Sequence, residues 1–162
     1  MKRIFTAIPL LAATIAPAAA SMQLKSPAFD AGDAIPVRYT CDGESVSPPL
    51  HWGGVPAGAR SLALIVDDPD APGGTFVHWV LYNLPPSVTH LNAGVTPEQG
   101  AHGARFGINS RGQAAYAGPC PPSGVHHYHF KLYVLDTRLP ARGHMTKAAL
   151  LQVMQGHRVG MA

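Results

Sequence analysis

Runs of apolar residues bounded by turn-forming residues divide the chain into short strand-like segments. The longest are Phe76 to Leu84 and Tyr128 to Leu135, which are rich in aromatic and β-branched residues. Two shorter runs, Ile35 to Thr40 and Ser61 to Val66, each end at a turn sequence in which Asp accompanies Gly or Pro. The pattern therefore predicts several short strands joined by tight turns.

Only two segments have the signals of a helix start. Thr96-Pro97-Glu98 combines a capping residue, a proline at the first position and an early acid, which predicts a short turn. Thr146 is positioned to cap a helix from Lys147 to Gln155 that Gly156 ends, and its apolar residues lie on one face, as expected for docking on a sheet. The order of elements predicts a mainly β protein: a single-domain antiparallel β sandwich with short peripheral helices, one of them near the C-terminus.

Alternation along the two longest strands predicts which side chains share a face. If residues 125–135 form one strand, one face carries His126, Tyr128, Phe130, Leu132 and Val134, and the other carries His127, His129, Lys131 and Tyr133. On the earlier strand Phe76, His78, Val80 and Tyr82 are expected to lie together. His78 and His126 are thus each predicted to emerge from an apolar face.

The first twenty residues have the three parts of an export signal. Lys2-Arg3 is followed by an apolar run and then by the small residues Ala18-Ala19-Ala20. We expect residues 1–20 to be a signal peptide, residues 21–162 to be the domain, and the protein to be periplasmic or secreted. The leader is short for a membrane span and is interrupted by Pro9 and Pro17, so no span is expected.

Composition argues against a helical bundle and against a nucleic-acid-binding protein. Charged residues make up 13% of the chain, and it has 17 Gly and 16 Pro, which favours short strands and structured loops over helical bundles. Without Lys2 and Arg3, ten basic residues face nine acidic ones, and the basic residues are scattered singly. A nucleic-acid partner is therefore not expected.

Cys41 and Cys120 are the two cysteines of the chain. In an exported protein an even pair first indicates a disulfide, with two buried free thiols as the alternative. Sequence does not show whether the two cysteines lie close together.

The candidate chemistry lies beside proline-rich loops. Asp68-Pro69-Asp70-Ala71-Pro72 precedes His78, and Gly118-Pro119-Cys120-Pro121-Pro122 precedes His126 and Tyr128. Prolines fix φ and remove backbone donors, so the polar side chains among them take defined positions. An Asp, two His and a Tyr together accept from a cation, donate to an anion or change charge near neutral pH.

Several motifs in order resemble the phosphatidylethanolamine-binding protein family, in its bacterial Raf-kinase-inhibitor-like branch. They are Tyr39-Thr40-Cys41-Asp42-Gly43, Ser47-Pro48-Pro49-Leu50, Asp68-Pro69-Asp70-Ala71-Pro72, His78-Trp79-Val80, Asn83-Leu84-Pro85 and the segment 118–128. The resemblance covers nearly the whole chain from Leu24 onward. It implies a central antiparallel β sandwich with a small anion-binding pocket at one end.

The resemblance also assigns ligand-binding residues by position. They are Asp68, Asp70, Pro72, His78, Gly118, Pro121, Pro122, His126 and Tyr128. The two imidazoles and the phenol would donate to phosphate-type oxygens, while Asp68 would hold an imidazole tautomer or meet an ammonium group.

The chain departs from the family pattern at three places. His127 stands where the family usually has Arg, and the loop from Pro72 to His78 is short. Most members end in a further strand after the helix, whereas this chain stops at Gly160-Met161-Ala162, so we expect that strand to be missing and a sheet edge to be exposed.

The leading hypothesis is a non-enzymatic binding protein for a phosphorylated head group or similar small anionic or zwitterionic ligand, with a regulatory role or peripheral contact with lipid head groups. One alternative is a protein-interaction module that inhibits a protease or kinase, although the sequence identifies no protein partner. Another is an Asp/His hydrolase, but no Gly-x-Ser-x-Gly elbow is present. No cofactor and no metal are expected, because strand parity separates His126 from His127 and His129.

Overall fold

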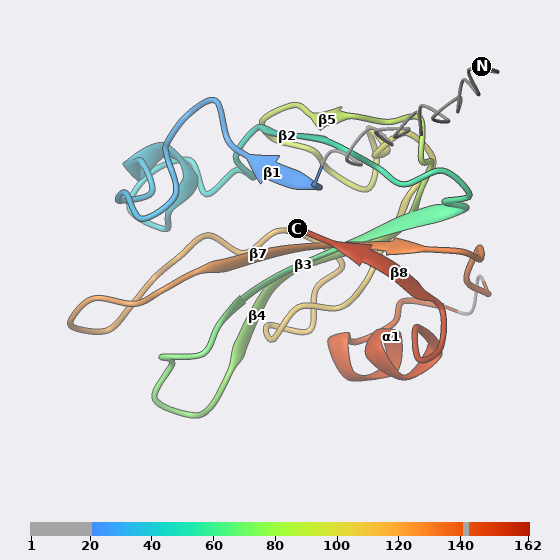
Figure 1. The fold of residues 1–162 in the computed structure, drawn as a ribbon. Helices are drawn as coiled ribbons and strands as arrows, with labels where there is room; N and C mark the ends of the chain where they lie inside the picture. Colours follow the sequence, from blue (N-terminus) through green and yellow to red (C-terminus); the bar gives the residue numbers. More distant parts are fainter. Residues whose placement is uncertain (1–20, 141–142) are drawn as a thin grey trace, which may run out of the picture.

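The computed structural model describes residues 21–140 and 143–162, so the expected signal peptide lies outside the described residues. Two antiparallel sheets stack on each other, and a helix covers the far side of the larger one (Figure 1). This arrangement confirms the mainly β sandwich. Among the described residues, no helix has the length and apolar character to cross a membrane.

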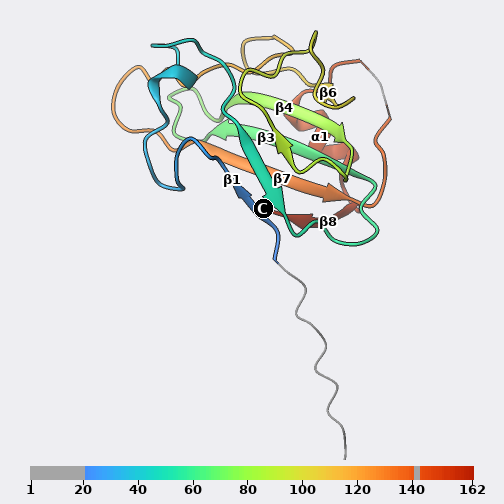
Figure 2. The same cartoon turned by 90° about the horizontal axis from the view of Figure 1, so that it is seen from above.

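The smaller sheet has three strands in the order β1-β2-β5, namely β1 (Gln23–Lys25), β2 (Leu50–Gly53) and β5 (His90–Leu91). The larger has five in the order β6-β4-β3-β7-β8, which lie side by side in Figure 2. They are β6 (Arg105–Phe106), β4 (Phe76–Leu84), β3 (Ser61–Asp68), β7 (His129–Leu135) and β8 (Arg158–Met161). Its three central strands are those that the sequence predicted, with β3 two residues longer and β7 one residue shorter than expected.

Two hydrophobic clusters hold these layers together. Between the sheets, β2 contributes Leu50 and Trp52, and the facing residues of the larger sheet include Leu64, Leu81 and Leu132. On the other side of the larger sheet, Ala63, Ile65, Val80, Tyr82, Tyr133 and Leu135 pack with Leu150 and Met154. The alternation predicted along β7 is confirmed within the strand, because Leu132 and Val134 lie in the first cluster and Tyr133 in the second. The extension predicted back to residue 125 was wrong: β7 begins at His129, so His126 and Tyr128 lie in the loop before the strand.

The helix near the C-terminus is α1 (Lys147–Val153). The Thr146 side chain accepts a hydrogen bond from the Ala149 amide at 3.2 Å, which confirms the predicted cap. The helical conformation ends two residues before Gln155, and Gly156 has the left-handed φ of +78° that its identity indicated.

One strand prediction was wrong. Ile35 to Thr40 is not a strand, because η1 (Val37–Tyr39) is a 3-10 helix whose first residues follow Pro36. The Tyr39 amide donates to the Pro36 carbonyl at 2.9 Å, and the Thr40 hydroxyl donates to the Val37 carbonyl at 2.9 Å. These local bonds satisfy the groups that a strand would pair with a neighbour, and Pro36 fixes a φ of −56° that suits a turn.

The expectation of a missing final strand was also wrong. β8 follows α1 and pairs antiparallel with β7, matching Tyr133 with Met161 and Val134 with Gly160. The Ala162 amide and carbonyl both bond to Leu132, at 2.9 and 2.8 Å, so the pairing continues to the last residue. β8 has only four residues, of which Val159 alone is β-branched. The sequence pattern therefore did not distinguish this strand from an irregular C-terminal segment.

Candidate functional site

Three chain segments meet at one end of the larger sheet. In the antiparallel register, Asp68 at the end of β3 lies opposite Phe76 at the start of β4, and Asp67 lies opposite His129 at the start of β7. The loop before β7 carries His126 and therefore lies beside both ends. Asp68, His78, His126 and Tyr128 are called the pocket cluster below.

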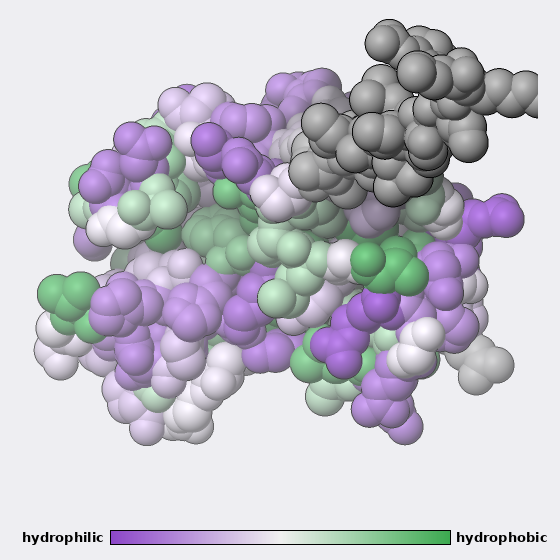
Figure 3. All heavy atoms as spheres, viewed as in Figure 1, coloured by the Kyte–Doolittle hydropathy of each residue, from purple (hydrophilic) through white to green (hydrophobic). Residues whose placement is uncertain are grey.

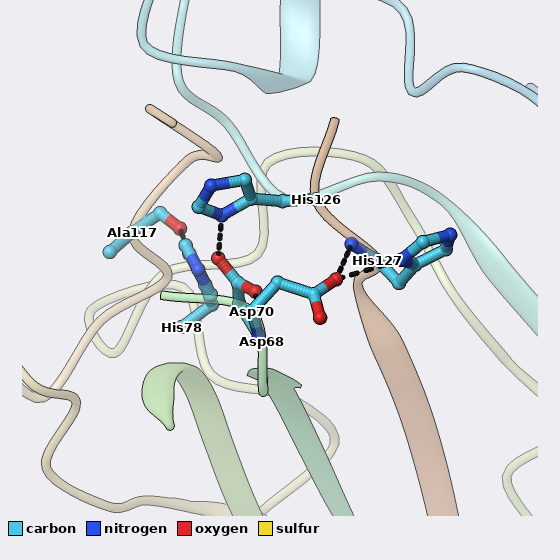
Figure 4. Close-up of polar contacts among 6 residues, drawn as sticks. All are labelled: Asp68, Asp70, His78, Ala117, His126 and His127. Carbon is cyan, nitrogen blue, oxygen red and sulfur yellow. Dashed lines mark hydrogen bonds and ion pairs between the residues drawn. The ribbon is translucent and has the colours of Figure 1, made fainter. Parts of the chain in front are cut away.

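The centre of the cluster is a hydrogen-bonded pair of side chains, Asp68 and His126. His126 Nδ1 lies 2.6 Å from Asp68 Oδ2, and the two side chains are only 7% and 4% exposed. Asp68 Oδ1 accepts a hydrogen bond from the Asp70 amide at 2.8 Å. Because the carboxylate only accepts, the Nδ1 atom of His126 carries a proton and its Nε2 atom points away from Asp68 (Figure 4).

His78 is 4% exposed and is held by the backbone. Its Nδ1 atom lies 2.6 Å from the Ala117 carbonyl oxygen, and the Ala117 amide donates to the His78 carbonyl at 2.9 Å. A carbonyl oxygen cannot donate, so Nδ1 carries the proton. Burial lowers the pKa of His78 below its ordinary value despite Ala117 and the nearby Asp68, which favours the neutral ring.

Tyr128 lies next to both imidazoles. Its ring centroid is 5.2 Å from that of His78, edge to face, and 6.5 Å from that of His126, nearly parallel. Burial raises the pKa of the Tyr128 phenol, with further contributions from Asp68 and Asp70, so the hydroxyl keeps its proton and can donate.

Two polar atoms of the pocket cluster are buried without a hydrogen-bond partner among the described residues. They are the Nε2 atom of His78 and the hydroxyl of Tyr128. Leaving such a group unsatisfied costs about 1–3 kcal/mol, and two on neighbouring rings indicate a place where a ligand or water contributes the missing bonds.

The face predicted for His78 was wrong in part. Its ring packs on Phe76, with centroids 4.7 Å apart, but Val80 and Tyr82 lie on the opposite side of the sheet against α1. The β3–β4 register shifts from Val66 opposite Trp79 to Asp67 opposite Val77, which leaves His78 as an extra residue. Such a β-bulge breaks the simple alternation and turns His78 toward the pocket cluster.

Asp70 and His127 form a second, outer pair. Asp70 Oδ2 accepts from the His127 backbone amide at 2.8 Å and lies 2.7 Å from His127 Nδ1. Both side chains are exposed and lie to one side of the Asp68–His126 pair (Figure 4). The bond from His127 lowers the pKa of Asp70.

The disulfide predicted between Cys41 and Cys120 is present, with Cα atoms 5.4 Å apart. The Cys41 amide also donates to the Pro119 carbonyl at 2.9 Å. These links tie the loop that carries His126 to the segment after η1, so its position depends on contacts made far away in the sequence.

The resemblance assigned three prolines to the ligand-binding site. Pro72, Pro121 and Pro122 are all exposed. Pro121, together with His126 and Tyr128, lines a groove of about 1170 Å³ between segment 22–42 and the loop before β7. Asp68 and His78 lie outside its lining. Figure 3 shows a recess with hydrophobic surface between the two layers on this face. In residues 21–140 and 143–162, no group of three or more metal-ligating side chains is close enough to hold an ion.

Gly118 is a packing residue of the same loop. Its amide donates to Ser45 Oγ at 3.2 Å, and an added Cβ would lie 2.5 Å from that oxygen and 3.0 Å from the backbone of Thr40. We expect Gly118→Ala to lower the free energy of unfolding by about 1–3 kcal/mol, as overpacking does. Chemical denaturation measures this change.

Gly73→Ala is the matched control for that substitution. A Cβ at Gly73 meets nothing within 4 Å, and its φ lies outside the left-handed region. Its stability should stay within about 0.5 kcal/mol of the parent protein. Equal stabilities for the two variants would contradict the close packing at Gly118.

The sequence model of the phosphatidylethanolamine-binding protein family matches residues 25–162. The chain belongs to this family. A family relative from Methanothermobacter thermautotrophicus, a UPF0098 protein, is 52% identical over 143 residues, covering 87% of this chain and 94% of that protein.

Two further proteins are similar to this chain. The crystal structure of a homologue from Chlamydia trachomatis, CT736, has a TM-score of 0.82 at 42% identity and covers 88% of this chain and 93% of that one. A Mycobacterium tuberculosis protein named as a candidate lipoprotein, LppC, is 44% identical over 151 residues, covering 90% of this chain and 73% of that protein. Membership supports a binding-protein kind of function.

Sequence reasoning missed two parts of this end of the sheet. The Ala117 carbonyl fixes the tautomer of His78, and no side-chain signal marks it. Asp67 points to the other face, where it is buried and bonds to Lys131 and Lys147. Asp67 directly precedes Asp68 in β3, so alternation along this strand would have placed the second carboxylate on the opposite face.

Proposed function

We propose that the protein binds a small phosphate-type oxyanion, free or as a phosphorylated head group, at the pocket cluster and carries out no chemistry on it. The observation that carries the proposal is the pair of buried, unpartnered polar atoms, His78 Nε2 and the Tyr128 hydroxyl, beside the Asp68–His126 pair. Pro72, Gly118, Pro121 and Pro122 shape the surrounding loops, and Asp70 sits at the rim.

Each group has a role in this proposal. The Tyr128 hydroxyl donates to a ligand oxygen. Asp68 orients His126 and fixes its proton on Nδ1, which leaves Nε2 to face the ligand. His78 supplies a second ring nitrogen, Nε2, from beside the Tyr128 ring.

Binding is favoured over hydrolysis by the surroundings of the imidazoles. Among the described residues, no serine, threonine or cysteine side chain hydrogen-bonds to His78 or His126. An activated nucleophile needs a base within such reach. The Asp68–His126 pair therefore serves ligand placement in our proposal.

We also propose that the protein works outside the cytoplasm. The Cys41–Cys120 disulfide is typical of oxidising compartments, and the expected signal peptide would direct the chain there.

Titration calorimetry with inorganic phosphate tests the binding site. We expect His126→Ala to weaken affinity at least tenfold, because a hydrogen bond to a charged group contributes about 1.5–3 kcal/mol. His127→Ala is the matched control: it is the adjacent residue, its side chain is exposed, and it lies on the outer pair. We expect it to change affinity less than about threefold.

The two variants are compared at equal folded fraction, which thermal unfolding verifies. Equal affinities, or a larger loss from His127→Ala, would place the ligand outside the pocket cluster.

A further inference from the structure

The hydrogen-bonding groups of the pocket cluster determine which protonation state of a ligand fits. This inference rests on the proposed function. We infer that the protein selects ligands that bring their own proton: a protonated phosphate monoester or inorganic phosphate binds, and a phosphate diester or sulfate is disfavoured. The inference rests on the hydrogen-bond partner of His78 and on the burial of its other nitrogen.

The backbone fixes the tautomer of His78. The Ala117 carbonyl accepts from His78 Nδ1 at 2.6 Å, so the single proton of the neutral ring is already committed. The Nε2 atom then presents a lone pair to the pocket. It is buried and has no partner among the residues that the structure describes.

Giving Nε2 a proton is costly. His78 is 4% exposed, and burial lowers its pKa, so the imidazolium form is disfavoured. The Ala117 bond and the carboxylates Asp68 and Asp67 favour the charged ring and Arg111 opposes it, but burial is the largest effect and the pKa of His78 is lowered. Tyr128, which touches the ring, stays neutral because burial raises its pKa.

The ligand has to match this neutral ring. In the neutral ring Nδ1 donates to Ala117, so Nε2 accepts a hydrogen bond and cannot donate one. An oxygen without hydrogen placed at Nε2 would set two lone pairs against each other. A P–OH group donates to Nε2, while the neighbouring Tyr128 hydroxyl donates to another oxygen of the same phosphate. A site built to bond a ligand hydrogen rejects an analogue that lacks it, because its buried group is then left unsatisfied.

The comparison of monomethyl with dimethyl phosphate tests this inference. At pH 5.5 both carry about one negative charge, since the second pKa of a phosphate monoester is about 6, but only the monoester has a P–OH group. Calorimetry should show at least tenfold tighter binding of monomethyl phosphate. Its affinity should fall as pH rises above about 6, because the ligand loses the proton that His78 needs.

Sulfate and head-group compounds extend the comparison. Sulfate carries no proton in this range and should bind at least tenfold more weakly than inorganic phosphate at pH 6. Phosphoethanolamine and glycerophosphoethanolamine share the ammonium group, but only the first is a monoester. Tighter binding of phosphoethanolamine identifies a free monoester as the ligand. Tighter binding of glycerophosphoethanolamine identifies a lipid head group and overturns the inference.

His78→Gln supplies a variant with the opposite chemistry, because its amide can donate as well as accept. It should bring the affinities for monomethyl and dimethyl phosphate within about threefold of each other. In the parent protein, nitrogen-15 shifts of His78 report the tautomer directly, so the test holds even where the variant folds poorly. A proton on Nε2 in the free protein, or equal binding of both esters, overturns the inference and leaves the proposed function standing. Failure of every oxyanion to bind overturns both.

Discussion

Replacing Cys41 and Cys120 together by serine is expected to lower the free energy of unfolding by about 4–5 kcal/mol. The two residues are 79 positions apart, and cross-linking so long a loop removes much of the conformational entropy of the unfolded chain. The same substitution releases the loop before β7, which carries His126. Denaturation with guanidinium chloride measures the change.

The oxidised parent protein treated with reductant is the independent control for this variant. Reduction breaks the same link without introducing serine, so both samples should unfold at similar denaturant concentrations. The slope with denaturant should also rise in both, because the unfolded chain becomes more expanded without the cross-link. A loss below about 1 kcal/mol in both samples would show that the disulfide does not constrain the unfolded state as its span requires.

Replacing Lys131 and Lys147 together by methionine is expected to cost about 3–5 kcal/mol of stability at neutral pH. Asp67 is 1% exposed, and its two oxygens lie 2.8 Å from Lys131 Nζ and 2.5 Å from Lys147 Nζ. Removing both amines leaves a buried carboxylate without a counter-charge, which proteins tolerate poorly.

The pH dependence of stability separates this effect from lost packing. Burial alone would raise the pKa of Asp67, but the hydrogen bonds from Lys131 and Lys147 outweigh it and lower that pKa. In the parent protein the stabilisation is therefore present above the unfolded pKa of about 3.9 and is lost as pH falls through the lower folded pKa. In the variant burial raises the pKa of Asp67, so stability should instead increase as pH falls through that raised pKa toward the unfolded value of about 3.9.

Adding Asp67→Asn to the two methionine substitutions is the matched rescue, because it removes the buried charge. Arg38→Ala is a second control that breaks the exposed pair with Glu44 and should cost less than about 1 kcal/mol. If the rescue variant is no more stable than the double variant, lost packing rather than charge explains the effect.

The sequence could predict those elements whose local signals and tertiary contacts agree. β4 was predicted to the residue and α1 with its cap, because aromatic and β-branched residues fill the strand and Thr146 stands directly before the helix. Ile35 to Thr40 failed because Pro36 favours a local turn that apolar composition does not reveal. β8 is so short that only its pairing with β7 defines it.

The candidate site was predictable in its residues but not in its geometry. Asp68, His78, His126 and Tyr128 meet as the motifs indicated. The β-bulge that turns His78 toward them depends on the register between β3 and β4, which alternation within one strand cannot reveal. The same holds for Ala117, whose contribution comes from its backbone oxygen.

The order of strands in the larger sheet has a consequence for how the chain folds. One edge of β3 pairs with β4, which follows it directly in the sequence. Its other edge pairs with β7, which lies much further along the chain and matches Ser61 with Leu135 and Asp67 with His129. Closing such long loops is entropically costly before any contact rewards it, so folding on the scale of milliseconds to seconds is expected. The β3–β4 hairpin is the natural nucleus, and the end of the sheet that holds the pocket cluster is completed only when β7 docks.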